Sequence, residues 1–256
     1  MKIFLVCDLN RTVEALAELG PRGPLSAAVI ITVAFATLAR WVRGVSFGGA
    51  IAGAAVCFLL YAGAGAGAFA ALVSVFALTW ISTRFGYRRK EKLGTAEKLD
   101  GRTALQVLAN LAIAAGCAGL SAFSATKAVL LLAVSAALSE AAADTVSSEL
   151  GQARSVNARL ITTWDKVPAG TDGGVSWVGT FAGIVAAAAV SLVGAVTGLI
   201  PPRWLGISII AAVTGMIADS FLGALLERRK LLNNDAVNFL GTLIAAATAS
   251  LLVSLM

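Results

Sequence analysis

Carboxylates inside long apolar stretches are the residues of this sequence best suited to chemistry. Glu140 and Asp144 are four residues apart and therefore share one face of a helix. Asp219 lies within another apolar stretch, while Glu149 ends one and Asp235 begins another. A carboxylate in hydrocarbon costs roughly 2.5–3.5 kcal/mol. Each of these acids therefore needs a function or a compensating partner, such as a basic side chain or a proton shared with a neighbouring helix.

Two of these acids occur in similar surroundings. Asp144 is followed by Thr145 and Asp219 by Ser220, and in both cases a basic residue ends the apolar stretch. If the two helices run in the same direction, the acids lie at equal depth. Two facing carboxylates would form a divalent-cation site, because Mg²⁺ is typically held by one or two carboxylates together with water and substrate phosphates.

A glycine-rich segment lies between these two acids in the sequence. Residues 166–176 read KVPAGTDGGVS, and an apolar stretch follows directly. Glycines before a helix N-terminus can expose successive N–H groups to a phosphate. The pattern differs from the ordinary P-loop, and a simple flexible turn remains the alternative.

Basic and amide groups complete the set of polar candidates. The segment 84–102 is rich in Arg and Lys, which either control topology and contact anionic lipid or form a basic wall for phosphates. Asn110 lies inside an apolar stretch, and Asn234 and Asn238 are four residues apart near the start of another. Those two amides either bind a ligand or belong to a helix cap.

The composition limits the chemistry and identifies the environment. The 256 residues include no His, which excludes a Ser-His-Asp triad and His metal ligands, and the three Cys are too far apart for a zinc site. With 58% hydrophobic and 13% charged residues, the chain is far less charged than a soluble domain. It is therefore a polytopic membrane protein.

The elements that position the acids are transmembrane helices. We predict an all-α bundle of about eight spans, with seven to nine compatible, in a single domain over residues 24–256 that follows an N-terminal amphipathic or surface segment, 1–23. Most basic residues fall on one side, which predicts that the functional loops face the cytoplasm. The Ala- and Gly-rich, short-looped chain is typical of a bacterial inner-membrane protein. The expected spans are 25–42, 47–63, 66–86, 103–122, 126–149, 174–200, 204–226 and 236–255.

These motifs together resemble one family. The chain is similar to the integral-membrane family of phytyl-phosphate kinases and their uncharacterised relatives, domain-of-unknown-function family ninety-two. The matching segments, from about residue 47 to the C-terminus, are RFGYRRKEKLG (84–94), QVLAN (106–110), EAAADTVSSE (140–149), KVPAGTDGGVS (166–176), DSFLG (219–223) and NDAVNFL (234–240).

The resemblance implies a reaction and a site. It implies phosphorylation of a prenyl monophosphate to its diphosphate by a nucleoside triphosphate, often CTP, with Mg²⁺, in isoprenoid metabolism that leads to tocopherol. The expected catalytic residues are Asp144, Asp219 and Lys166, and the expected metal-binding residues are Asp144, Glu149, Asp219, Asn234 and Asp235. The expected substrate- and nucleotide-binding residues are Arg88, Arg89, Lys92, Asn110, Ser148, Gly170, Thr171, Gly173, Gly174 and Asn238.

Two other functions stay open at the level of the sequence. One is a cytidylyltransferase that joins a lipid phosphate to a nucleotide, and the other is a lipid or ion transporter that uses the buried acids. The expected partners are the prenyl phosphate, the nucleotide and membrane lipid, with no nucleic acid. The sequence leaves open which prenyl phosphate and nucleotide are used and whether the chain forms a homodimer.

Overall fold

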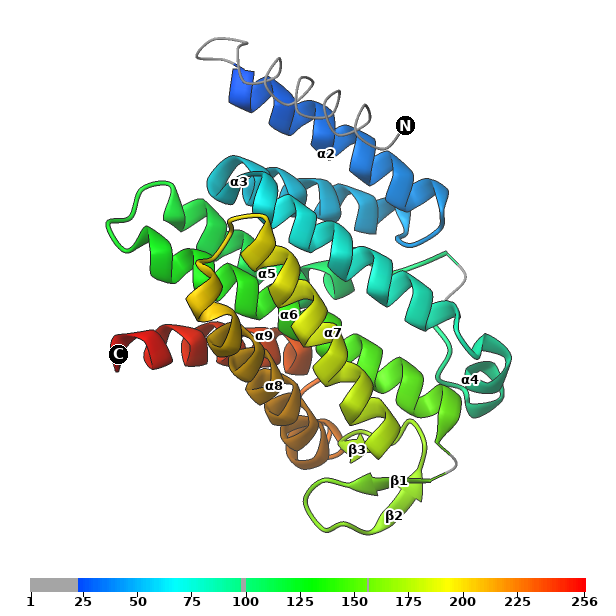
Figure 1. Cartoon of the computed structure of the whole chain (residues 1–256). Coiled ribbons are helices and arrows are strands. Elements are labelled where there is room, and N and C mark those ends of the chain that lie inside the picture. Colours follow the sequence, from blue (N-terminus) through cyan, green and yellow to red (C-terminus); the bar gives the residue numbers. More distant parts are fainter. Residues whose placement is uncertain (1–22, 98–99, 156) are drawn as a thin grey trace, which may run out of the picture.

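The structure, a computed structural model, describes residues 23–97, 100–155 and 157–256. This part of the chain is a bundle of long apolar helices with a small sheet at one end (Figure 1). Six of its helices are long and apolar enough to cross a membrane. The all-α transmembrane class is thus confirmed, although the count is lower than the eight spans predicted. The predicted surface segment, 1–23, lies outside the described residues except for Gly23.

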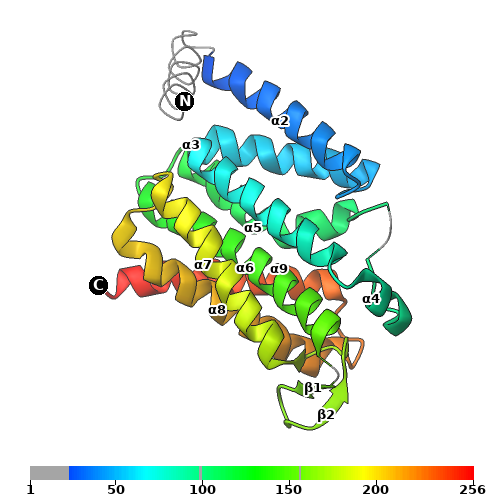
Figure 2. The same cartoon turned by 45° about the vertical axis from the view of Figure 1, so that its right-hand side comes forward.

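The difference in span count arises at the first two helices. Helix α2 (Gly23–Trp41) has an apolar part, Leu25–Trp41, that is shorter than a full span. Helix α3 (Phe47–Arg84) takes up both spans predicted at 47–63 and 66–86. It is broken at Gly65, whose φ of 80° and ψ of −171° are not helical. The chain folds back there, and the two limbs of α3 run side by side (Figures 1 and 2).

The remaining spans end within a few residues of their predicted limits, apart from the longer α6. They are α5 (Ala104–Ser121), α6 (Lys127–Arg154), α7 (Trp177–Val196), α8 (Leu205–Leu222) and α9 (Asn234–Ser254), with a 3₁₀ turn, η2 (Pro202–Trp204), before α8. Helix α6 lies at the centre, in contact with α3, α5, α7, α8 and α9 (Figure 1). Every residue of α6 from 132 to 143 is buried, so its apolar character on all sides matches its position.

Buried hydroxyl groups fix α6, α7 and α8 relative to one another. The hydroxyl of Ser208 on α8 is 2.9 Å from that of Ser135 on α6 and 2.9 Å from that of Ser191 on α7. Asp144 follows Ser135 by nine residues and Asp219 follows Ser208 by eleven. At 1.5 Å per residue these distances along the two helices are roughly 14 and 17 Å. Since α6 and α8 run in the same direction, the two acids arrive at nearly the same depth, as predicted.

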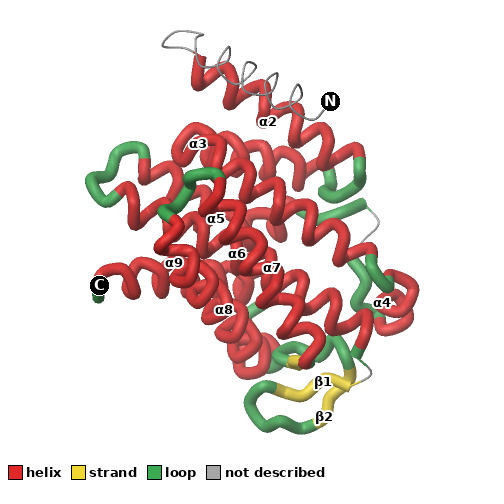
Figure 3. Tube along the Cα trace, viewed as in Figure 1, coloured by secondary structure: helices red, strands yellow, loops and turns green. Residues whose placement is uncertain are grey.

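The short elements gather at one end of the bundle. Helix α4 (Tyr87–Leu93) follows α3, and a π-helical turn, η3 (Gly223–Glu227), extends α8. Three strands lie between α6 and α7 in the order β2-β1-β3, paired antiparallel (Figure 3). They are β1 (Asn157–Leu160), β2 (Lys166–Pro168) and β3 (Gly174–Val175). The predicted loop between the fifth and sixth spans is therefore a small sheet.

Candidate active site

A polar cavity of about 240 Å³ lies at the end of the bundle that carries the sheet. We call it the polar cavity. Its walls come from α5, α6, α8 and α9, from the segment before α5, and from the turn between β2 and β3. Predicted site residues from five separate parts of the sequence meet there: Asn110, Asp144, Ser148, Glu149, Gly170, Thr171, Gly173, Gly174, Asp219, Asn234 and Asn238.

Two carboxylates from neighbouring helices line this cavity. Asp144 of α6 and Asp219 of α8 lie within hydrogen-bonding reach of each other. Within the described chain, the Oδ2 atom of Asp219 is buried and lacks a hydrogen-bond partner. Two adjacent carboxylates repel each other when both are ionised, so such a pair holds a shared proton or a cation.

A third carboxylate lies one helical turn below this pair. Glu140 is 1% exposed, and its Oε1 atom also lacks a hydrogen-bond partner among the described residues. Gly241 of α9 makes room for it: a Cβ atom there would lie 2.6 Å from Glu140 Oε1 and 3.3 Å from Asp219 Oδ2. Glu140 is absent from the lining of the polar cavity and supports its floor.

The rim of the cavity adds further acids that the sequence interpretation overlooked. Glu227, at the end of η3, lines the cavity eight residues after Asp219 and lies in electrostatic range of Asp144, Asp172 and Asp235. Asp172 lines it from the turn between β2 and β3. Glu227 lies at the end of an apolar stretch, just before three basic residues. In the sequence it is therefore indistinguishable from the charged residues that end a transmembrane span.

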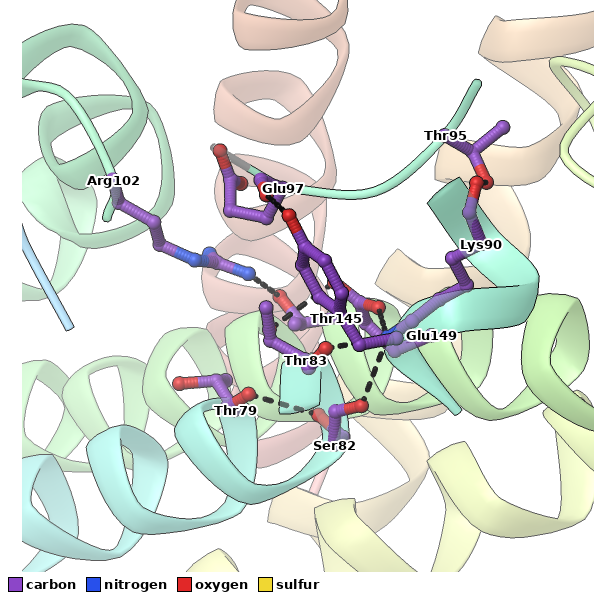
Figure 4. Close-up of polar contacts among 10 residues, drawn as sticks. Thr79, Ser82, Thr83, Lys90, Thr95, Glu97, Arg102, Thr145 and Glu149 are labelled. Atoms are coloured by element: carbon purple, nitrogen blue, oxygen red, sulfur yellow. Dashed lines mark hydrogen bonds and ion pairs between the residues drawn. The ribbon is translucent and has the colours of Figure 1, made fainter. Parts of the chain in front are cut away.

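Arg102 is the one basic residue among the described residues that line the polar cavity. Its backbone N–H donates to Gly44 O (3.1 Å), and its carbonyl accepts from Ser46 N (2.9 Å). Its guanidinium Nη2 donates to Thr145 Oγ1 (3.3 Å), beside Asp144 (Figure 4). In the sequence it is one of seven basic residues between 84 and 102. Its distinguishing signal is its place directly before the capping box that starts α5 at Thr103.

The other basic residues predicted for phosphate binding lie elsewhere. Arg88 and Lys92 are exposed on α4, and Lys166 is exposed on β2. Arg89 donates to Ser155 O at 2.6 Å. None of these four lines the polar cavity, and neither does Asp235, in the first turn of α9. Of the basic residues in the segment 84–102, Arg102 alone among those described lines the polar cavity.

Glu149, predicted to bind a metal ion, is instead paired with protein groups. Its Oε2 forms an ion pair with the buried Nζ of Lys90, and its Oε1 accepts from Thr83 Oγ1 at 3.1 Å (Figure 4). Both carboxylate oxygens therefore have partners, and the charge is compensated. Glu149 holds α4 against α6 at the edge of the cavity.

The glycine-rich turn is shaped by its own hydrogen bonds and by its contact with η3. Within the described chain, Thr171 N and Gly174 N donate to Pro168 O and Thr171 O, while the N–H groups of Gly170, Asp172 and Gly173 take no part in backbone bonds of the turn. Gly173 has a φ of 71°, and a Cβ atom there would lie 2.6 Å from Ala224 Cα. The turn therefore packs tightly against the end of α8.

The amides differ in how they are held. Asn110 donates from Nδ2 to Gln106 O (2.9 Å), and it lines the polar cavity from α5. Asn234 and Asn238 line it from the first turns of α9, whose N-cap is the neighbouring Asn233. The capping function considered for this segment therefore belongs to Asn233, and the other two amides face the cavity.

Comparison with known proteins assigns the chain to a family. The family described as integral membrane protein DUF92 matches residues 30–246. An uncharacterized membrane protein of Synechocystis sp. is 35% identical over 195 residues, which are 75% of this chain and 76% of that protein. Protein VTE6, chloroplastic, of Arabidopsis thaliana is 30% identical over 219 residues, 82% of this chain and 66% of that protein.

A third organism supplies a further relative. An uncharacterized membrane protein of Methanocaldococcus jannaschii is 34% identical over 176 residues, 68% of this chain and 71% of that protein. No solved structure matches the chain. The match over most of the sequence, together with the apolar helices, shows that this chain belongs to the DUF92 family of integral membrane proteins.

Proposed function

We propose that the protein is a membrane-embedded kinase that phosphorylates a prenyl monophosphate, similar to phytyl phosphate, to its diphosphate with a nucleoside triphosphate, CTP in the first instance. The observation that carries the proposal is the acidic polar cavity built around Asp144 and Asp219 inside a helix bundle of this family. The motifs that resemble phytyl-phosphate kinases supply most of its walls.

The charge of the cavity supports polyphosphate binding with a cation. Glu97, Asp144, Asp172, Asp219 and Glu227 line it together with Glu149, whose charge is compensated by Lys90, whereas Arg102 is the sole base among its described lining residues. Such a cavity repels a bare nucleoside triphosphate. A divalent cation that enters with the nucleotide reverses this repulsion, which is the arrangement that phosphoryl-transfer enzymes use.

The residues present fit Mg²⁺ bound mainly by substrate. Among the described residues, no group of three His, Cys, Asp or Glu side chains is placed to hold a metal ion. Asp144 and the unpartnered Asp219 Oδ2 provide two carboxylates, and the phosphates and water would complete the coordination. When bound, Mg²⁺ would neutralise charge on the transferring phosphoryl group. Asn234, which lines the same cavity, is a candidate for further support.

The protein groups bind and orient the two substrates. An oxygen of the prenyl phosphate attacks the γ-phosphorus of the nucleotide, the bond from that phosphorus to the β–γ bridging oxygen breaks, and the nucleoside diphosphate leaves. The attacking oxygen is already anionic, so no strong general base is needed. We assign the binding of phosphate oxygens to Arg102 and to the glycine-rich turn at Gly170, Asp172 and Gly173, which line the same cavity.

We also propose that the polar cavity faces the cytoplasm of a bacterial inner membrane. The end of the bundle that carries α4, the sheet and η3 is the end rich in Arg and Lys. Basic loops remain on the cytoplasmic side, where nucleoside triphosphates are present.

The test is an assay of the purified full chain with phytyl phosphate, each of the four nucleoside triphosphates and Mg²⁺, with both products identified by mass spectrometry. We expect CDP and phytyl diphosphate, and loss of the reaction in EDTA. Asp144→Asn and Asp219→Asn should each lower kcat by about a hundredfold or more, because they remove charge from the phosphoryl-transfer site. They should also weaken binding of Mn²⁺, measured by electron paramagnetic resonance.

Asp165→Asn is the matched control, because Asp165 is exposed in the turn between β1 and β2. It should retain wild-type activity. Full activity in both Asp144→Asn and Asp219→Asn would contradict the role given to the carboxylate pair. Pyrophosphate with a CDP-lipid as products would replace the kinase by a cytidylyltransferase, and uptake of lipid without nucleotide turnover would replace it by a transporter.

A further inference from the structure

A second cavity, mostly apolar, lies beside the polar cavity. Its volume is about 260 Å³, and we call it the apolar cavity. Helix α2, both limbs of α3, helix α5 and Ala141 of α6 line it, together with the segments before α3 and before α5. Small side chains such as those of Ala36, Ala39, Ala50 and Gly53 leave this space open.

The two cavities share a boundary of four polar residues. Glu97, Arg102, Gln106 and Asn110 line both of them. Gln106 Nε2 donates to Glu97 Oε2 (3.2 Å), and the Gln106 side-chain carbonyl accepts from Thr103 N (2.7 Å), so this boundary is fixed at the start of α5. A ligand that spans both cavities would therefore place its polar group at Arg102 and its apolar part among α2, α3 and α5.

The apolar cavity also adjoins the outside of the bundle between α2 and α3. An open apolar groove runs there, and Phe35, Phe76 and Trp80 line both this groove and the apolar cavity. Phe35 makes an edge-to-face contact with Phe76 (ring centroids 5.4 Å apart). The groove is bordered by Leu38 and Ile81, which are 47% and 58% exposed and so face the hydrocarbon of the membrane. Three aromatic rings thus separate the lipid phase from the apolar cavity.

We propose that the apolar cavity binds the isoprenoid chain of the substrate, which reaches it sideways from the bilayer between α2 and α3, and that Arg102 binds the monophosphate at the junction. This inference rests on the proposed function. Its argument is the match of polarity. The anionic head of the amphiphile fits Arg102 at the boundary, next to the acidic cavity where the cation and the nucleotide would bind, and its long apolar tail fits the apolar cavity.

The decisive variant is Gly53→Leu. A Cβ atom at Gly53 would meet no atom within 4 Å, so the larger side chain fills open space of the cavity without a clash at its base. The measurement compares kcat/KM for the phosphates of a C20, a C10 and a C5 isoprenoid. We expect the variant to lose about tenfold or more with the C20 substrate relative to the C5 substrate, because an apolar pocket discriminates by volume.

Gly116→Leu is the matched control. Gly116 is an exposed glycine of α5, and its Cβ would likewise meet no atom within 4 Å. It should leave the preference for chain length unchanged. Retained C5 activity in Gly53→Leu shows that the variant is folded.

The outcomes separate this inference from the proposed function. If the wild type phosphorylates none of the three substrates, the proposed function fails. If the wild type is active and Gly53→Leu changes all chain lengths equally or not at all, the tail binds elsewhere and the apolar cavity holds bilayer lipid instead.

Photolabelling gives an answer that does not depend on turnover of the variant. A C20 prenyl phosphate with a diazirine at the end of its chain should label wild-type peptides from α2 and α3 around Phe35 and Phe76. Excess unlabelled prenyl phosphate should suppress the labelling, whereas excess phospholipid should not. Labelling confined to other helices, or suppressed equally by phospholipid, would overturn the inference.

Discussion

Lys90 is completely buried, although it belongs to a seven-residue helix rich in charged side chains. Its ammonium group pairs with Glu149 and donates to the carbonyls of Ser82 (3.1 Å) and Thr83 (2.6 Å) (Figure 4). A buried ion pair roughly balances its desolvation cost, but the loss of one partner leaves an uncompensated charge. The pair therefore fixes α4 to the ends of α3 and α6, beside the polar cavity.

Lys90→Met should lower the free energy of unfolding by about 3–5 kcal/mol, because Glu149 would remain buried without a cation. The measurement is the thermal unfolding midpoint of the purified protein in detergent. Lys92→Met is the control, since Lys92 is exposed on the same helix and should change little. The double variant Lys90→Met/Glu149→Leu should recover part of the loss. Equal midpoints for Lys90→Met and Lys92→Met would show that the pair contributes no stability.

At the scale of single residues, the sequence identifies site residues whose surroundings are evident from the neighbouring sequence. Asp144 and Asp219 stand out because a carboxylate within an apolar helix is costly, and the structure brings them together. Lys90 and Arg102 belong to the same basic segment as Arg88 and Lys92. The one local signal in it is the place of Arg102 directly before the capping box at Thr103, and nothing local distinguishes Lys90. The burial of Lys90 and the position of Arg102 depend on contacts with α6 and with the turn before α3, which join residues more than forty positions apart.

At the scale of the elements, the turn between β2 and β3 depends on the end of α8 for its position. Gly173 combines a positive φ with close contact to Ala224, so both its backbone and its missing side chain matter. Gly94 has nearly the same φ, 73°, but a Cβ there would meet no atom within 4 Å. A substitution at Gly94 therefore tests the effect of backbone strain alone, whereas one at Gly173 adds a steric clash with Ala224.

Gly173→Ala should raise the KM for the nucleotide by roughly tenfold to a hundredfold, because the turn must move away from η3 and a small displacement of a phosphate-binding group is costly. Gly94→Ala carries the same strain, about 1 kcal/mol, and should leave that KM close to the wild-type value. Steady-state kinetics with both substrates varied provide the measurement. An equal effect of the two substitutions would show that strain alone explains the loss.

Long apolar helices are the elements that the sequence predicts best, because a span requires about 20 apolar residues and this length is visible without tertiary information. The small sheet was missed since its strands have four, three and two residues, too few to show alternation. The predicted boundary between the spans 47–63 and 66–86 coincides with the break of α3 at Gly65. The two limbs of α3 that meet there correspond to these two predicted spans.

For the whole molecule, the distribution of polarity along the bundle carries the functional argument. Helix α6 has 28 residues and a length of about 42 Å at 1.5 Å per residue. It separates residues 122–126 at one end from the polar cavity and the sheet at the other (Figure 1). A kinase that uses cytoplasmic nucleotide requires the second end to face the cytoplasm.

Cysteine labelling tests this orientation directly. With the native cysteines replaced, Ala125→Cys and Thr163→Cys place one thiol at an exposed position at each end. In intact bacterial cells, a membrane-impermeant maleimide should label Ala125→Cys and spare Thr163→Cys, while permeabilised cells should show labelling of both. The reverse pattern would place the acidic cavity outside the cytoplasm, where no nucleoside triphosphate is available. The kinase proposal would then fail even with the carboxylate pair intact, because the cavity would be separated from its phosphoryl donor.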